Sequence, residues 1–286
     1  MCYSKEVSLV AGSAILAVSS YNIVKWQLFK NKEDGICSQI PGAIKFLTLG
    51  FVCIGLHQFF EFFAISYQNI FVYKLGLVTS ISAMYFNIRS SEIFLRKYLH
   101  SKLVFLLISL TGIHIFSREV VFENYHFYVR GESHFYWGAI WLLLFLYWNF
   151  IHIFSLNNIG DKRRSFTMLL PISALNISFI LSAVYCYSIG LYQNLYSTKP
   201  LAQVCAGLFS SFEIVFDAPS IWCVFATLQG PLIIWFSNRL MRYRDMNFPR
   251  VKGSVIKPII CSLVLVFTIF LSLPLVSSLS YKMMLK

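Results

Sequence analysis

Residues 52–66 read VCIGLHQFFEFFAIS, and this stretch decides the class of fold that the chain adopts. It is apolar on most sides, yet it carries His57, Gln58 and Glu61 in the middle of an expected membrane-spanning helix. His57 and Glu61 are four residues apart, so the sequence places them on one helix face. An ionisable pair at that depth is costly unless it faces protein, a partner or water. The three residues therefore mark a candidate polar site inside a helical bundle.

The composition of the whole chain is typical of a membrane protein. Of its 286 residues, 57% are hydrophobic and only 13% are charged, and the mean hydropathy is +0.66. A soluble domain carries about twice that charged fraction. Continuous apolar runs, rather than alternating ones, favour helices over a barrel. The sequence predicts an all-α, polytopic transmembrane helical bundle of about eight spans, formed as a single domain by residues 1–286.

The expected spans are apolar runs separated by polar loops. They cover residues 7–24, 43–66, 70–88, 103–117, 135–156, 166–191, one crossing within 201–237, and 255–279. The crossing within 201–237 is the seventh helix, and we expect it to be broken near Asp217 and Pro219. Nine spans are the alternative, with residues 201–216 and 220–237 as a tight hairpin. Residues 118–134 mix charged and aromatic side chains and are expected to lie along the membrane interface.

The net charge of +12 comes from Lys and Arg residues gathered in particular loops. The loops after the first, third and fifth helices and residues 238–254 are rich in them. This alternation predicts that those loops are cytoplasmic and that both termini lie outside. The positive charge then reflects topology and contacts with the lipid bilayer, and nucleic acid is not an expected partner. The seven cysteines show no disulfide or metal-ligand spacing.

A second acidic pair, Glu213 and Asp217, repeats the four-residue spacing at the expected break. A broken helix with a carboxylate at the break is a common construction for an ion or substrate site. Asp217 is equally suited to capping a helix that starts at Pro219. Residues 52–61 and 204–213 (VCIGLHQFFE and VCAGLFSSFE) also match in register. This match suggests an inverted repeat relating about residues 43–66 to 195–218, or a coincidence in a biased composition.

Four side chains, His57, Glu61, Glu213 and Asp217, are candidate metal ligands because they offer nitrogen and oxygen donors. The sequence contains no HExxH, nucleophile or nucleotide-binding motif, so it specifies neither a reaction nor a cofactor. The leading hypothesis is transport or binding of a small solute or proton at the polar site. One alternative is an intramembrane enzyme that uses the same groups as acid, base or metal ligands. The other is a structural subunit of a membrane complex, with the polar groups as interhelical contacts.

The N-terminal MCYS, which contains Cys2 and Ser4, and the HQFFE of residues 57–61 resemble a family of uncharacterised bacterial integral membrane proteins. Those proteins have Met-Cys-(aromatic)-Ser at the N-terminus and (His/Gln)-Gln-x-x-Glu in the second helix. A glycine usually follows the Glu, whereas this chain has Phe62. The resemblance covers the first third of the chain. It implies that Cys2, Ser4, Gln58 and Glu61 are the residues of interest, and it implies no reaction.

Overall fold

The computed structural model describes seven elements and several shorter pieces of the chain. The described residues are 5–30, 39–94, 99–123, 126–129, 133–156, 227, 231, 233–235, 237–238, 256–265 and 267–268. The elements are α1 (Lys5–Lys30), α2 (Gln39–Tyr67), α3 (Ile70–Phe94), α4 (Ser101–Ser117), β1 (Val120–Glu123), β2 (His126–Val129) and α5 (Ser133–Leu156). The described part is therefore helical apart from one short hairpin.

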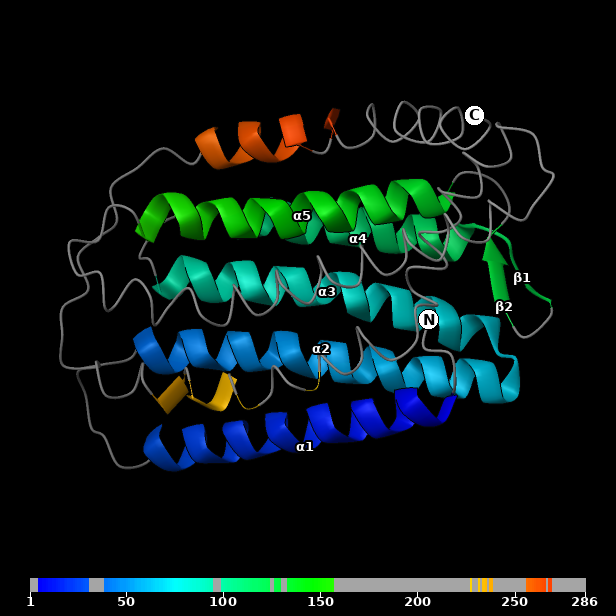
Figure 1. The fold of residues 1–286 in the computed structure, drawn as a ribbon, viewed down its shortest axis with the longest axis horizontal. Coiled ribbons are helices and arrows are strands. Elements are labelled where there is room, and N and C mark those ends of the chain that lie inside the picture. The colour runs from blue at the N-terminus through cyan, green and yellow to red at the C-terminus, as the bar shows by residue number, and fades with distance from the viewer. Residues whose placement is uncertain are drawn as a thin grey trace, which may run out of the picture.

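The helices lie roughly parallel to one long axis and run alternately in opposite directions (Figure 1). Helices α1, α2 and α3 lie side by side, with α2 in contact with both of its neighbours. Helices α4 and α5 lie beyond α3 and both contact it. One end of the bundle therefore gathers the starts of α1, α3 and α5, and the other gathers the starts of α2 and α4.

Three of these helices are long and apolar enough to cross a membrane, within the part of the chain that the structure describes. They contain the stretches Ser8–Lys25, Gly42–Tyr67 and Ile70–Ile93. Helix α4 has 17 residues, which is shorter than the roughly 20 that a full span needs. The predicted span at 166–191 and the predicted break at Asp217 lie outside the described residues. Only a few residues of 201–237 and about half of the predicted span at 255–279 are described.

Two helices extend past the ends that the sequence predicts. Helix α1 continues to Lys30 rather than stopping at residue 24, and α3 continues to Phe94 rather than stopping at residue 88. The prediction ended each helix where charged residues began. Lys and Arg have long side chains that reach an interface from inside a helix, and both residues are good helix formers. Lys25 and Arg89 are therefore helical residues, not loop residues.

The segment predicted to lie along the interface contains an antiparallel hairpin, so the described fold is not purely α. Strand β1 pairs with β2 in the register Val120↔Val129 and Phe122↔Phe127. Both strands are rich in β-branched and aromatic residues, which favour extended backbone. The Phe127 ring stacks on Tyr73 of α3, with ring centroids 4.4 Å apart. This contact holds the hairpin against the end of the bundle where α3 begins.

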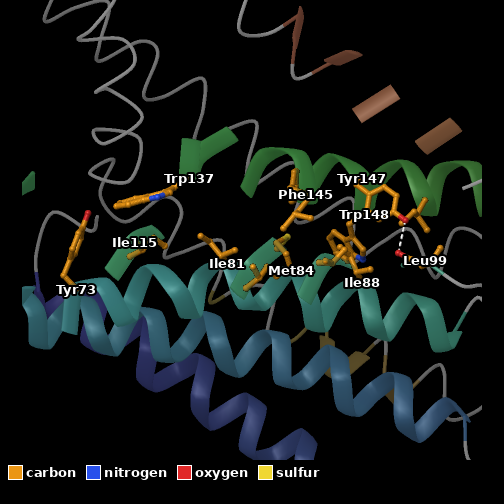
Figure 2. Packing of buried hydrophobic residues seen from close by; sticks show 14 of the residues in the cluster. Tyr73, Ile81, Met84, Ile88, Leu99, Ile115, Trp137, Phe145, Tyr147 and Trp148 are labelled. Carbon is orange, nitrogen blue, oxygen red and sulfur yellow. Dashed lines mark hydrogen bonds between the residues drawn. The ribbon is translucent and has the colours of Figure 1, made fainter. Parts of the chain in front are cut away.

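The main apolar core lies between α3, α4 and α5 (Figure 2). Ile81, Met84 and Ile88 of α3 contribute to it from successive turns. The polar groups of two aromatic side chains in this core form hydrogen bonds. The Tyr147 hydroxyl donates to the Leu99 carbonyl oxygen at 3.0 Å. The Trp148 ring N–H donates to a serine hydroxyl of α3 at 2.9 Å. The aromatic side chains of α5 thus fasten α5 to α3 and to the turn before α4.

The contact between α1 and α2 depends on small residues. A Cβ atom added to Gly12 would lie 2.8 Å from the Phe59 ring and 3.2 Å from the Gly55 carbonyl oxygen. A Cβ atom added to Gly55 would lie 2.9 Å from Leu16 and 3.0 Å from Ile15. Close approach at small residues is a usual way for helices to associate in membranes. It brings the polar side chains of α1 within reach of α2.

Gly55→Ala tests this close contact. The added methyl group overlaps Leu16 at both Cγ and Cδ2 and meets Ile15, which is fully buried. We expect a lower thermal stability in detergent, with a cost of about 1–3 kcal/mol from overpacking. Gly42→Ala is the control, because its Cβ would meet its nearest neighbour only at 3.9 Å. Equal melting temperatures for the two variants would contradict the proposed packing.

Candidate polar site between helices α1, α2 and α3

The Glu61 carboxyl group is buried between α2 and α1. Only 4% of Glu61 is exposed, and the hydroxyl of Ser8 donates to its Oε2 at 3.2 Å. Ser8 is itself fully buried and is the fourth residue of α1. The backbone N–H groups at the start of a helix carry partial positive charge, which favours a nearby carboxylate. Glu61 is thus held by a hydroxyl donor and lies near the start of a neighbouring helix.

Gln58 and Glu61 form one buried polar strip, because they are three residues apart on α2. Gln58 is 1% exposed, and its Cβ is the atom that a side chain on Gly12 would meet at 3.2 Å. Glu61 lies six to seven residues from the middle of Gly42–Tyr67, which is about 10 Å along a helix. The carboxyl group therefore lies toward the end of the bundle where α1 begins, not at the middle of the span.

His57 contacts a different helix from Glu61. Its Nδ1 atom lies 2.9 Å from the carbonyl oxygen of Gly76 in α3. A carbonyl oxygen only accepts, so Nδ1 carries the hydrogen, and Nε2 keeps its lone pair when the imidazole is neutral. No hydrogen bond to Nε2 is formed by the residues that the structure describes. The imidazole is therefore held in the tautomer of a proton acceptor, close enough to Glu61 for electrostatic interaction.

The sequence-predicted site is thus only partly in view. His57, Gln58 and Glu61 lie within one turn of α2, with His57 bonded to α3 and Glu61 bonded to α1. These polar side chains, which the sequence places on one helix face, therefore contact two neighbouring helices. Of the remaining candidates, Cys2, Ser4, Glu213 and Asp217 lie outside the described residues.

No group of three or more His, Cys, Asp or Glu side chains suited to a metal ion occurs in the described ranges. His57 and Glu61 are the metal candidates that fall in these ranges. A histidine nitrogen and a carboxylate are two donors, whereas a structural or catalytic metal site usually needs three or more protein ligands. The described residues therefore supply part of a ligand set and leave metal binding a prediction.

A second buried polar cluster joins α1, α2 and the piece of chain at 237–238. The Asn22 side-chain amide donates to the Thr48 hydroxyl at 2.7 Å and to the Ser237 hydroxyl at 3.2 Å. Lys25 donates to the Asn238 side-chain oxygen at 2.6 Å. This cluster was not predicted from the sequence. Asn22 and Thr48 lie inside predicted apolar spans, and polar residues in that position could have indicated a contact between helices.

A third cluster surrounds Glu92, which is 6% exposed and was also missed. Glu92 pairs with Arg89 and accepts a hydrogen bond from the Leu99 backbone N–H at 3.0 Å. It also accepts one from the Ser101 hydroxyl at 2.6 Å. These contacts fasten the end of α3 to the start of α4. The prediction that α3 stops at residue 88 placed this carboxylate in a loop, where burial was not expected.

Glu92→Ala should lower stability by about 3 kcal/mol or more, since it leaves Arg89 unpaired and two buried donors unsatisfied. Unfolding followed by thermal melting in detergent measures the loss. Glu119→Ala removes an exposed carboxylate between α4 and the hairpin and should change stability by less than about 0.5 kcal/mol. A Glu92→Ala protein as stable as Glu119→Ala would show that this anchor has no stabilising role.

No protein-family model, curated protein or solved structure matches this chain. The resemblance to uncharacterised bacterial membrane proteins therefore stays a prediction. The chemistry of the residues themselves is the basis for a functional assignment.

Proposed function

We propose that this chain is a multi-pass integral membrane protein that transports or binds a small polar solute or a proton, and that His57 and Glu61 handle protons in this function. The observation that carries the proposal is the burial of the Glu61 carboxyl group within a long apolar helix. Ionisable side chains inside membrane-spanning helices are rare, and in many membrane proteins they mark proton relays and solute pathways.

The arrangement of His57 supports a proton-handling role over a purely structural one. A structural role for His57 between α2 and α3 is fulfilled by the hydrogen bond from Nδ1 to Gly76. That bond leaves the Nε2 lone pair as a base one helical turn from a carboxyl group. Glu61 lies about 10 Å from the middle of its span, whereas His57 lies about 4 Å from it. The pair thus offers two proton acceptors at successive depths.

The charge distribution supports an orientation for this protein. The end where α2 and α4 begin carries the basic residues Lys25, Lys30, Lys45, Arg89 and Lys102. Glu92 is the acidic residue described there. The opposite end has Lys5, Lys74 and Arg118 together with Glu6, Glu61, Glu119 and Glu123. Positive charge marks the cytoplasmic side of membrane proteins. We infer that α1 begins outside and that Glu61 lies nearer the outer face of a bacterial inner membrane.

The proposal extends to the parts of the chain outside the described residues. Eight spans, a broken seventh helix and a contribution from Glu213 and Asp217 are part of the same proposal, because a broken helix with carboxylates is a common construction for an ion or substrate site. They remain proposals, as does the alternative that the same groups serve an intramembrane enzyme.

Labelling with dicyclohexylcarbodiimide tests the proton-handling role. This lipid-soluble reagent reacts with protonated carboxyl groups, so a proton-handling Glu61 should be modified in vesicles faster at acid pH than at alkaline pH. Mass spectrometry of the full chain locates and counts the adduct. Glu61→Gln should abolish this labelling, and His57→Gln should alter its rate.

The matched control is Glu119→Gln, which removes an exposed carboxyl group and should leave labelling at residue 61 unchanged. A Glu61 that stays unlabelled at every pH would contradict the proposal. A labelling rate independent of pH would contradict it as well, because the carboxyl group would then not exchange protons with the solution.

A further inference from the structure

Four successive helices carry a basic residue at the same level of the bundle. These residues, here called the cationic belt, are Lys25 of α1, Lys45 of α2, Arg89 of α3 and Lys102 of α4. Lys25 and Lys45 lie at the same level because the Asn22–Thr48 hydrogen bond joins the two antiparallel helices. Lys25 is three residues after Asn22 and Lys45 is three residues before Thr48, so both lie beyond this bond toward the same end.

The other members of the belt are placed by direct contacts. The Arg89 guanidinium lies over the ring of Phe46, the neighbour of Lys45, at 5.9 Å from the ring centroid. Arg89 pairs with Glu92, which accepts a hydrogen bond from Ser101, the neighbour of Lys102. The belt therefore runs continuously from α1 to α4.

The belt is positively charged and accessible. Lys45 and Lys102 are exposed, and the Arg89 side chain is 39% exposed. Glu92 is the carboxylate that lies beside the belt among the described residues, and it is buried in its contacts with Arg89 and the start of α4. Four cations thus lie beside one carboxylate in the described part of the belt.

Large apolar side chains are exposed on the same helices beside the belt. Tyr21 and Val24 lie next to Lys25, and Leu103, Phe105 and Leu106 follow Lys102 along α4. The Lys25 ammonium lies 5.7 Å from the centre of the Tyr21 ring. Basic side chains next to an exposed apolar surface match a phospholipid, whose charged headgroup adjoins its acyl chains. A soluble anion has no acyl chains to contact the exposed apolar side chains beside the belt.

We propose that the cationic belt binds the headgroups of anionic phospholipids in the leaflet at this end of the bundle. The inference rests on the proposed membrane-spanning function and adds a lipid partner to it. The Lys and Arg side chains extend to the phosphate groups while their alkyl parts stay on the apolar helix surface.

The test compares the lipids that stay bound to the full-length protein after extraction from vesicles of equal phosphatidylglycerol and phosphatidylcholine. Native mass spectrometry should show that the wild type retains phosphatidylglycerol preferentially. A K45Q/K102Q variant should lose about fivefold of that preference for each cation removed, the factor that corresponds to about 1 kcal/mol per basic residue. A K5Q/R118Q variant loses the same charge at the opposite end and should keep the preference.

Three outcomes overturn the lipid proposal. The first is equal retention of both lipids by the wild type, and the second is an equal loss of preference in both variants. The third is displacement of phosphatidylglycerol by inorganic phosphate, since the belt would then be a site for a free anion. Flotation of the wild type with the vesicles separates these results from a failure of the membrane assignment, in which the protein would not float.

Discussion

A carboxyl group inside an apolar helix layer must be matched by donors from the protein, and Glu61 meets this constraint at the contact between α1 and α2. The contact is close because Gly12 and Gly55 have no side chains of their own to hold the two helices apart. The close approach lets the Ser8 hydroxyl reach the carboxyl group, and it places the start of α1 beside it. If α1 moved away, the carboxyl group would lose the hydrogen bond from Ser8. The packing of small residues and the polar site are therefore one structural feature, and neither is explained without the other.

The side-chain hydrogen bonds between α1 and α2 lie toward the two ends of these helices, and an apolar layer separates them. The Ser8–Glu61 contact lies near one end and the Asn22–Thr48 contact near the other. Between them an apolar cluster is formed by Ile15, Phe51 and Ile233 with Val18, Leu47 and Ile54. Polar groups cost most at the middle of a bilayer, so this distribution suits a membrane-spanning layer. His57 lies nearer the middle of its span than Glu61 does, and its Nδ1 atom contacts the backbone of α3.

The sequence predicted the helical class because long apolar runs give an unambiguous signal, and α2 and α5 lie close to their predicted ranges. It also pointed to Gln58 and Glu61 as polar residues inside a span, and both are buried. It could not show that His57 and Glu61 contact different helices, because spacing on one helix does not say which neighbours surround it. The burial of Glu92 was not predicted for a related reason. A charged residue near the end of an apolar run indicates a loop, and only the fold brings Leu99 and Ser101 close to Glu92.

The central claim is that α1 lies against α2 with the Glu61 side chain closed between them. Disulfide cross-linking in membranes measures this most directly, in a protein whose native cysteines are replaced. Ser8→Cys paired with Glu61→Cys should cross-link rapidly under mild oxidation, because the two side chains are in hydrogen-bonding contact. Val10→Cys paired with Glu61→Cys should not, because Val10 lies on the exposed side of α1. Absent cross-linking of the first pair, or equal cross-linking of both pairs, would contradict the account.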